Sequence, residues 1–246
     1  MKAQAKVRSR NQSTRHRGAI APRTSEPLND QIYQKLRWAL TTGEYRPGQA
    51  LTIRKLAESF QTSAMPVRET LKRLASERAL EVTPNRAFRT IGMNATRIAG
   101  LFDIRRRLES MATRLATPRL TINQIQRLAS MEGAMLEAVD RNDRTRYLVS
   151  NYTFHFTIYT ACGNQDLIAI IEGLWVQIGP FLGTMLEQHG FTHEFRLFHD
   201  AVVAAIRVRD TESACKAIED DIDWATQFFL HLNEKGNLAN ASKGSG

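Results

Sequence analysis

The segment Thr52–Lys72 reads TIRKLAESFQTSAMPVRETLK, and its pattern decides the fold of the first part of the chain. Its first half predicts a short helix whose apolar face is formed by Leu56, Ala57 and Phe60. Gln61–Ser63 then predicts a tight turn, after which apolar residues recur again with helical spacing. Two short helices joined in this way indicate a helix-turn-helix arrangement.

The second helix of this segment is amphipathic. Thr62 or Ser63 can cap its N-terminus, and Pro66 lies in its first turn, where a missing N–H is harmless. Its apolar stripe consists of Val67, Leu71 and Leu74. The stripe leaves three basic residues on the outer side of the helix, namely Arg68, Lys72 and Arg73. A helix-turn-helix protein lays such a cationic second helix in the DNA major groove.

The flanking sequence completes a winged helix. A preceding helix, capped by Asn29 or Asp30, carries an apolar face of its own. After the helix-turn-helix segment, residues 80–83 and 88–91 predict two strands of a β-hairpin. Two basic residues stand in this wing, where they can meet phosphates or a minor groove: Arg86 and Arg89.

The net charge of +9 is concentrated in the first part of the chain. Residues 1–98 hold 19 Lys and Arg against 7 Asp and Glu, whereas residues 99–246 hold 15 against 18. The excess is not confined to the N-terminal arm, because residues 25–98 still carry 12 basic against 7 acidic side chains. This asymmetry indicates that only the first part binds a polyanion.

The length of 246 residues suits two ordinary domains, and the content of 42% hydrophobic and 24% charged residues is typical of a globular protein. No apolar run predicts a transmembrane helix or a secretory signal, so we expect no membrane partner. Cys162 and Cys215 fit no metal motif and favour reduced thiols in a cytoplasm.

Three segments lack helical or strand periodicity. Residues 1–25 predict a disordered basic arm, which either adds salt-dependent attraction to phosphates or is a solvated tail. Residues 93–98 are predicted to be a linker, and residues 235–246 are predicted to be a flexible tail. The predicted domains are therefore a winged helix at 26–92 and an all-helical domain at 99–234.

The second domain is predicted to be a bundle of six or seven helices, because apolar residues recur with helical spacing almost throughout it. The predicted helices span approximately 99–115, 124–140, 144–162, 166–179, 180–187, 194–208 and 211–232.

Four polar residues of this domain are embedded in apolar sequence, and they are Asn151, His155, His199 and Asp221. The first two lie four residues apart on one helix face, and the others lie on two later helices. A single histidine on an apolar face is usually a satisfied core residue, but four such groups need partners. One divalent metal ion with O, N, N and O donors would satisfy them all.

The first domain contains Gly43-Glu44-Tyr45-Arg46-Pro47-Gly48, Leu51, Leu56-Ala57 and Pro66-Val67-Arg68-Glu69 followed by Leu71, Arg73 and Leu74. With these motifs it resembles the GntR family of bacterial transcription regulators. The resemblance implies base or phosphate contacts by Arg54 and Arg68. The full set expected to contact DNA is Arg54, Thr62, Ser63, Met65, Arg68, Lys72, Arg73, Arg86 and Arg89. Three departures are Ala64 for a frequent arginine, Arg78-Ala79 for acid-glycine, and Ala87 for the wing glycine.

The second domain contains Asp103-Ile104-Arg105 with Leu108-Glu109, Asn151-x3-His155 before Gly163-Asn164, and His199 followed by Asp210 and Asp221. It resembles the FCD-type effector domain of the FadR-like branch of that family. The resemblance implies a divalent metal (Zn, Ni or Mn type) held by Asn151, His155, His199 and Asp221. Asn151 replaces the family's aspartate and Asp221 its last histidine, so a metal-free pocket is the alternative.

The resemblance also implies an effector site made of Arg105 together with the four metal-site residues. Arg105 borders the apolar stripe of its helix and would bind an effector carboxylate in a bidentate pair. The alternative is that the run at 105–107 is a solvated face.

Together these features predict a dimeric, bacterial transcription repressor, cytoplasmic and nucleoid-associated, that binds a double-stranded operator under control of a small organic acid. It would not be an enzyme. Two alternatives are a metal-dependent enzyme tethered to DNA by its basic domain, and a protein that coats DNA without sequence preference.

Overall fold

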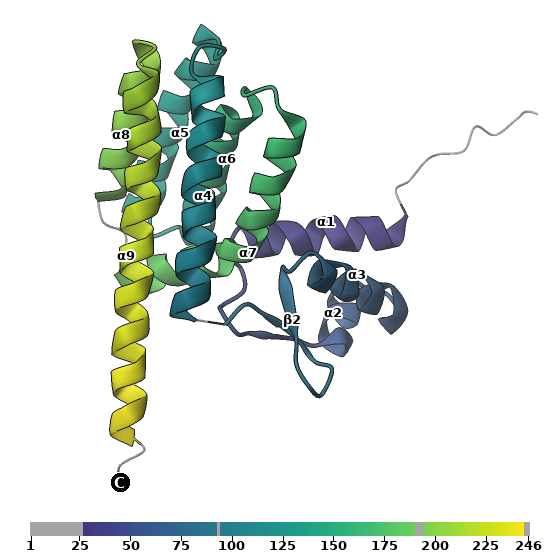
Figure 1. The fold of residues 1–246 in the computed structure, drawn as a ribbon. Coiled ribbons are helices and arrows are strands. Elements are labelled where there is room, and N and C mark those ends of the chain that lie inside the picture. Colours follow the sequence, from purple (N-terminus) through teal and green to yellow (C-terminus); the bar gives the residue numbers. More distant parts are fainter. Residues whose placement is uncertain (1–26, 93, 190–193, 244–246) are drawn as a thin grey trace, which may run out of the picture.

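The computed structural model describes residues 27–92, 94–189 and 194–243, which form two packed domains (Figure 1). Three helices and a small sheet form a winged helix, and the next six helices form a bundle. The fold is therefore mainly helical, as the sequence predicts.

The winged helix contains α1 (Leu28–Thr41), α2 (Ile53–Ser59) and α3 (Ala64–Ser76). Its core is formed by the predicted apolar faces, and the most buried of these side chains are Ile32, Leu36, Leu40, Val67, Leu71 and Leu74. The predicted cap of α1 was wrong, because Pro27 occupies the N-cap and both Asn29 and Asp30 lie in the first turn. Proline suits a helix start because its φ is fixed and it has no N–H to satisfy.

The sheet has three antiparallel strands in the order β1-β3-β2 rather than the predicted hairpin alone. The hairpin pairs β2 (Leu80–Val82) with β3 (Phe88–Thr90), and the additional strand β1 (Ala50–Leu51) pairs with β3. In the wing turn, Arg86 adopts a left-handed φ of 59°. The left-handed residue of the turn is therefore one position before Ala87, at which the resemblance described above implies a glycine.

The bundle consists of α4 (Ala95–Ala116), α5 (Ile122–Asp140), α6 (Arg144–Thr160), α7 (Gln165–His189), α8 (Glu194–Arg207) and α9 (Thr211–Lys243). Six helices agree with the predicted number. In Figure 1, α4 and α9 run side by side in front of α5, α6 and α8, and these two helices pack extensively against each other.

Two ends of the predicted bundle differ from the structure. Helix α4 begins at Ala95, because the Asn94 side chain accepts a hydrogen bond from the Arg97 backbone N–H at 2.9 Å. Most of the predicted 93–98 linker is therefore helical. Helix α9 continues to Lys243, through most of the predicted 235–246 tail (Figure 1). That segment mixes good helix formers, namely Leu238, Ala239 and Ala241, with poor ones such as Gly236, so the extension follows from the helix that precedes it rather than from composition alone.

Helix α7 was wrongly predicted as two helices separated at Pro180. It is continuous, with Pro180 inside it, and changes direction along its length in Figure 1. Proline removes one backbone hydrogen bond and bends a helix without necessarily ending it. Contrary to expectation, α7 also passes a length-and-composition test for a membrane span over Gln165–Glu187. Because 72% of its most apolar stretch is buried inside the protein, it has the character of a core helix.

The two domains meet where the end of α1 crosses α7. Val176 of α7 belongs to the core of the winged helix, and Arg37 pairs with Glu172 at 3.1 Å. A side chain at Gly179 would place its Cβ 2.0 Å from the Leu40 carbonyl oxygen, so this contact requires glycine. We call this contact between 37–43 and 172–183 the domain seam.

Candidate DNA interface and buried polar pocket

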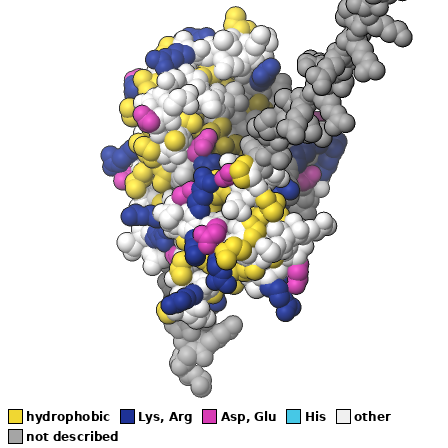
Figure 2. All heavy atoms as spheres, turned by 90° about the vertical axis from the view of Figure 1, so that its right-hand side faces the viewer, with side chains coloured by type: hydrophobic (Ala, Val, Ile, Leu, Met, Phe, Trp, Pro, Cys, Tyr) yellow, Lys and Arg dark blue, Asp and Glu magenta, His cyan; other side chains and the backbone are white. Residues whose placement is uncertain are grey.

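The residues expected to contact DNA lie on the surface of the winged helix. All are exposed except the half-buried Thr62, and Ser63 takes the N-cap position of α3. Figure 2 looks onto the side of the molecule where α1–α3 lie and shows Lys and Arg side chains spread over it, with acidic side chains between them. The sequence-based prediction that α3 turns its basic residues outward is therefore correct in geometry.

The exposed basic residues differ in whether an acidic side chain nearby forms an ion pair with them. Lys72 pairs with Glu69 at 2.9 Å, and Arg54 pairs with Glu58 at 3.4 Å. Arg68 makes no ion pair within the part of the chain that the structure describes. Such exposed pairs are weak and exchange readily for phosphates or base edges.

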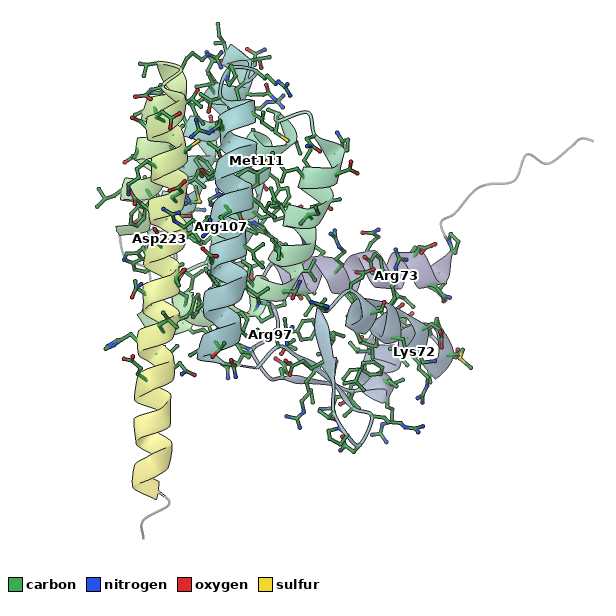
Figure 3. The ribbon with its side chains drawn as sticks, in the orientation of Figure 1. Lys72, Arg73, Arg97, Arg107, Met111 and Asp223 are labelled. Atoms are coloured by element: carbon green, nitrogen blue, oxygen red, sulfur yellow. The ribbon has the colours of Figure 1, made fainter. Side chains whose placement is uncertain are left out.

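Arg73 has a different environment from its neighbours on α3. Its guanidinium lies 3.7 Å from the centre of the Tyr33 ring and pairs with both Asp30 and Glu77. In Figure 3, Arg73 lies between α3 and α1, whereas Lys72 lies on the side of α3 away from α1. Arg73 is thus already engaged in joining the two helices, and its contact with DNA stays a prediction.

In the wing, Arg86 and Arg89 are both exposed. The Arg89 guanidinium donates to the Gly48 carbonyl at 3.4 Å, so it lies near the base of the sheet. Arg86 stands at the turn between β2 and β3, where it extends the basic surface beyond α3.

The bundle brings three of the four predicted metal ligands together. One ligand atom each from His155 on α6, His199 on α8 and Asp221 on α9 lies within 4.8 Å of the other two. His155 Nε2 is 3.5 Å from Asp221 Oδ2. Asn151, one turn before His155, lines the same cavity, as does Arg105 of α4. The sequence-based grouping of these residues is thus reproduced in space.

A second set of polar residues lies behind this cluster and is centred on Glu109 of α4. Arg105 donates to both carboxylate oxygens of Glu109, at 2.7 and 3.3 Å. Trp175 Nε1 donates to Oε1 at 3.0 Å, and the Tyr159 hydroxyl donates to Oε2 at 2.6 Å. The Tyr159 oxygen is also 2.9 Å from His155 Nδ1, which connects the network to the cluster.

Sequence reasoning did not assign a role to Glu109, Tyr159 or Trp175. One signal was present, because Glu109 follows Arg105 by four residues and Tyr159 follows His155 by four, which places each pair on one helix face. Arg105 is buried, which excludes the solvated-face alternative for this residue. Arg107 does face solvent, where it pairs with Asp103 at 3.2 Å.

Burial sets the protonation of the cluster. Desolvation lowers the pKa of His199 to about 4, and desolvation, His199 and Arg105 together lower the pKa of His155 well below its usual value. Desolvation raises the pKa of Asp221 to about 7, although Arg105 opposes that shift. Both imidazoles are therefore neutral near pH 7, the form in which histidine binds metals.

These three residues fit a divalent metal ion. Buried His199 Nε2 has no hydrogen-bond partner among the described residues, which is costly unless some other group fills the role. The 3.5 Å between His155 and Asp221 matches the separation of two atoms bound to one ion at roughly 2.0–2.2 Å. Two imidazoles and a carboxylate are donors that Zn²⁺, Ni²⁺ and Mn²⁺ accept.

The cavity beside the cluster is small. Its volume is about 30 Å³, and apolar side chains such as Leu182, Met185 and Trp224 form much of its wall. When volume is counted as the space open to the centre of a water molecule, one water needs roughly 10–15 Å³, so the cavity has room for about two. An organic ligand could enter only if the surrounding helices moved apart.

The exposed α3 of a winged helix, joined to a bundle that encloses a polar pocket, defines a DNA-binding protein with a ligand-sensing domain. The comparisons with known proteins agree. "Bacterial regulatory proteins, gntR family" matches residues 28–89, and "FCD domain" matches residues 100–223. The chain belongs to the GntR family of transcription regulators, in the FadR-like branch with an FCD domain.

Relatives that span most of this chain are also transcription regulators, not enzymes. The HTH-type transcriptional regulator McbR of Escherichia coli (strain K12) is 31% identical over 188 residues, which are 75% of this chain and 85% of McbR. The repressor GlaR of the same organism is 23% identical and covers 77% of this chain and 90% of its own. The structure of E. coli McbR/YncC superposes with a TM-score of 0.78 over 85% of this chain and 100% of that one, at 27% identity.

Proposed function

We propose that this protein is a repressor that binds a double-stranded DNA operator. Its affinity for the operator would fall or rise when a small organic acid enters the FCD domain. The observation that carries this proposal is that α1 of the winged helix packs directly against the bundle, on α7 at the domain seam and on α6 beside the pocket. The ring of Trp38 in α1 packs edge-on against the ring of Tyr152 in α6, with 5.2 Å between the ring centres. Tyr152 is next in sequence to the pocket residue Asn151. Several relatives are named repressors, which supports the same direction. A regulator of this kind acts on the chromosome, in the cytoplasm.

The operator would be bound by a homodimer whose two winged helices read two half-sites. A surface for the second copy is available on α4, where Ile104 and Met111, seven residues apart, are exposed, whereas Leu101, Leu108 and Leu115 pack against the bundle's own core. Ile104 and Met111 are 47% and 48% exposed, and Figure 3 shows Met111 and Arg107 on a part of α4 that no other helix crosses. Apolar residues in this heptad spacing favour pairing of two helices.

The pocket would hold a divalent ion of the Zn, Ni or Mn type through His155, His199 and Asp221, with Asn151 as the fourth donor. When bound, such an ion supplies positive charge that attracts an anionic effector. Arg105 is already paired with Glu109, so an effector carboxylate would have to compete for it. Because the cavity is smaller than an organic acid, effector entry would favour a more open arrangement of helices. A ligand shifts an equilibrium only by its difference in affinity for the two arrangements.

Replacing Arg68 by alanine is expected to weaken operator binding by about 1–3 kcal/mol, because the exposed guanidinium is free to read a base edge. The operator would first be identified by selection from a random DNA library, and affinities measured by fluorescence anisotropy at fixed salt. Arg127→Ala on α5 is the matched control, since Arg127 is also an exposed helical arginine. Equal operator affinity for Arg68→Ala and the wild type would remove Arg68 from the interface.

Replacing His155 by alanine is expected to reduce bound metal well below one ion per chain, because the cluster loses one of its two imidazole donors and His199 is left as the only nitrogen ligand. Metal content would be measured by mass spectrometry after dialysis against a defined Zn²⁺ buffer. His231→Ala is the control, because His231 is exposed on α9 outside the cluster. If wild-type protein takes up no Zn²⁺, Ni²⁺ or Mn²⁺, the metal proposal is wrong and the metal-free pocket replaces it.

A further inference from the structure

We propose that Glu109, acting through Tyr159, holds His155 in the tautomer that carries its proton on Nδ1. In this tautomer Nε2 carries no proton, and it lies 3.5 Å from Asp221 Oδ2. Glu109 and Tyr159 would then be positioning residues for the pocket, although neither touches the proposed ion. Their effect on metal affinity rests on the metal site proposed above, whereas the tautomer itself does not.

The first step of the argument is the state of Glu109. Its two oxygens accept four hydrogen bonds, two from Arg105 and one each from Trp175 and Tyr159. A carboxylate offers about four lone-pair sites, so all of them are used. The side chain is fully buried, and four donors from three helices hold it in one orientation. Glu109 is therefore a fixed acceptor that has no hydrogen of its own to give.

The second step concerns the single proton of the Tyr159 hydroxyl. At 2.6 Å from Glu109 Oε2, the hydroxyl must donate to the carboxylate, because a carboxylate can only accept. Having used its proton, the Tyr159 oxygen can only accept from His155 Nδ1, which lies 2.9 Å away. Neutral imidazole has one N–H, so a proton on Nδ1 leaves Nε2 as a bare lone pair.

The third step is what the bare Nε2 faces. It lies 3.5 Å from Asp221 Oδ2, and the His199 ring centre is 5.4 Å from that of His155. Without the network, the proton of His155 could move to Nε2 and be donated to Asp221, which would satisfy both groups and close the cluster to metal. Residues behind a metal-binding histidine commonly fix its tautomer in this way, and their loss typically weakens metal binding 10- to 100-fold.

The tautomer can be measured directly on metal-free protein by long-range ¹H–¹⁵N correlation NMR, which distinguishes Nδ1–H from Nε2–H imidazole. We expect His155 to be Nδ1–H in the wild type. In Tyr159→Phe, which keeps the ring but removes the hydroxyl, we expect the Nε2–H form to appear. Tyr152→Phe is the matched control, because it keeps the ring that packs on Trp175 and removes a hydroxyl from the same helix that binds neither Glu109 nor His155 Nδ1, so it should leave His155 unchanged.

Titration with Zn²⁺ alone supplies the second measurement. Tyr159→Phe is expected to bind Zn²⁺ about 10- to 100-fold more weakly than the wild type and Tyr152→Phe. A wild-type His155 in the Nε2–H form, or a Tyr159→Phe variant with unchanged tautomer, would overturn the proposal. If the wild type binds no Zn²⁺, the metal site fails, and the NMR result still decides the tautomer. Should Tyr159→Phe not fold, the wild-type spectrum alone decides it.

Discussion

Replacing Glu109 by glutamine is expected to lower the free energy of unfolding by about 3–5 kcal/mol. Glutamine has nearly the same shape, but it is neutral. Its amide NH2 is a hydrogen-bond donor and would face N–H or O–H groups that now donate to the carboxylate. The Arg105 guanidinium, only 4% exposed, would lose the carboxylate that neutralises it. An unpaired buried charge is among the most destabilising consequences of a single substitution.

The same helix offers a control with identical spacing. Asp103 and Arg107 also form an i,i+4 pair on α4, but they are 56% and 71% exposed. Asp103→Asn should therefore change stability by only about 0–1 kcal/mol. Urea denaturation of metal-free protein would measure both variants. A loss below about 1 kcal/mol for Glu109→Gln would contradict the role assigned to the buried pair.

A double variant distinguishes the stability lost with the ion pair itself from the cost of leaving the Arg105 charge buried and unpaired. Arg105→Met together with Glu109→Leu removes both ions and fills the space with hydrocarbon, so most of the stability should return. The Tyr159 hydroxyl and Trp175 N–H would still lack their acceptor, which limits the recovery. Recovery in the double variant, together with loss in the single one, would show that the unpaired charge dominates.

The same two pairs illustrate how far sequence can predict this protein. The winged helix was predictable because apolar spacing, a tight turn and a hairpin all indicate one arrangement. Asp103–Arg107 and Arg105–Glu109, by contrast, look alike in sequence, and only the packing of α6 and α7 against one side of α4 makes one pair buried. The His155, His199 and Asp221 cluster was predictable because each residue interrupts an apolar face. Glu109 was not, because a glutamate four residues after an arginine is usually a surface partner.

The remaining differences have similar causes. Pro180 was read as a helix end, yet the helices around it hold α7 together as a core helix despite the missing hydrogen bond. The polar end of α9 was read as a tail because it lacks an apolar stripe, but a helix can propagate from an established one without it. The contact of Arg73 with DNA stays a prediction, but its packing on Tyr33 could not be read from the sequence, because Tyr33 lies forty residues earlier.

Replacing Gly179 by alanine is expected to open the domain seam. The new Cβ would lie 2.0 Å from the Leu40 carbonyl oxygen and 2.6 Å from that of Thr41, and both atoms belong to the backbone. Because neither can move without shifting the end of α1, the substitution must displace α1 from α7. Overpacking of this kind costs roughly 1–3 kcal/mol or more, here concentrated at the contact between the two domains.

Hydrogen exchange would locate that effect, with faster exchange expected in peptides from the end of α1 and the middle of α7. Gly173→Ala is the matched control in the same helix, because its Cβ would meet no atom within 4 Å. It should raise stability by up to about 1 kcal/mol, since alanine favours helix more than glycine does. If the seam transmits the effector signal, Gly179→Ala should bind the operator but lose its response to ligand. A variant that keeps both slow exchange at the seam and a normal response would show that the glycine contact does not couple the domains.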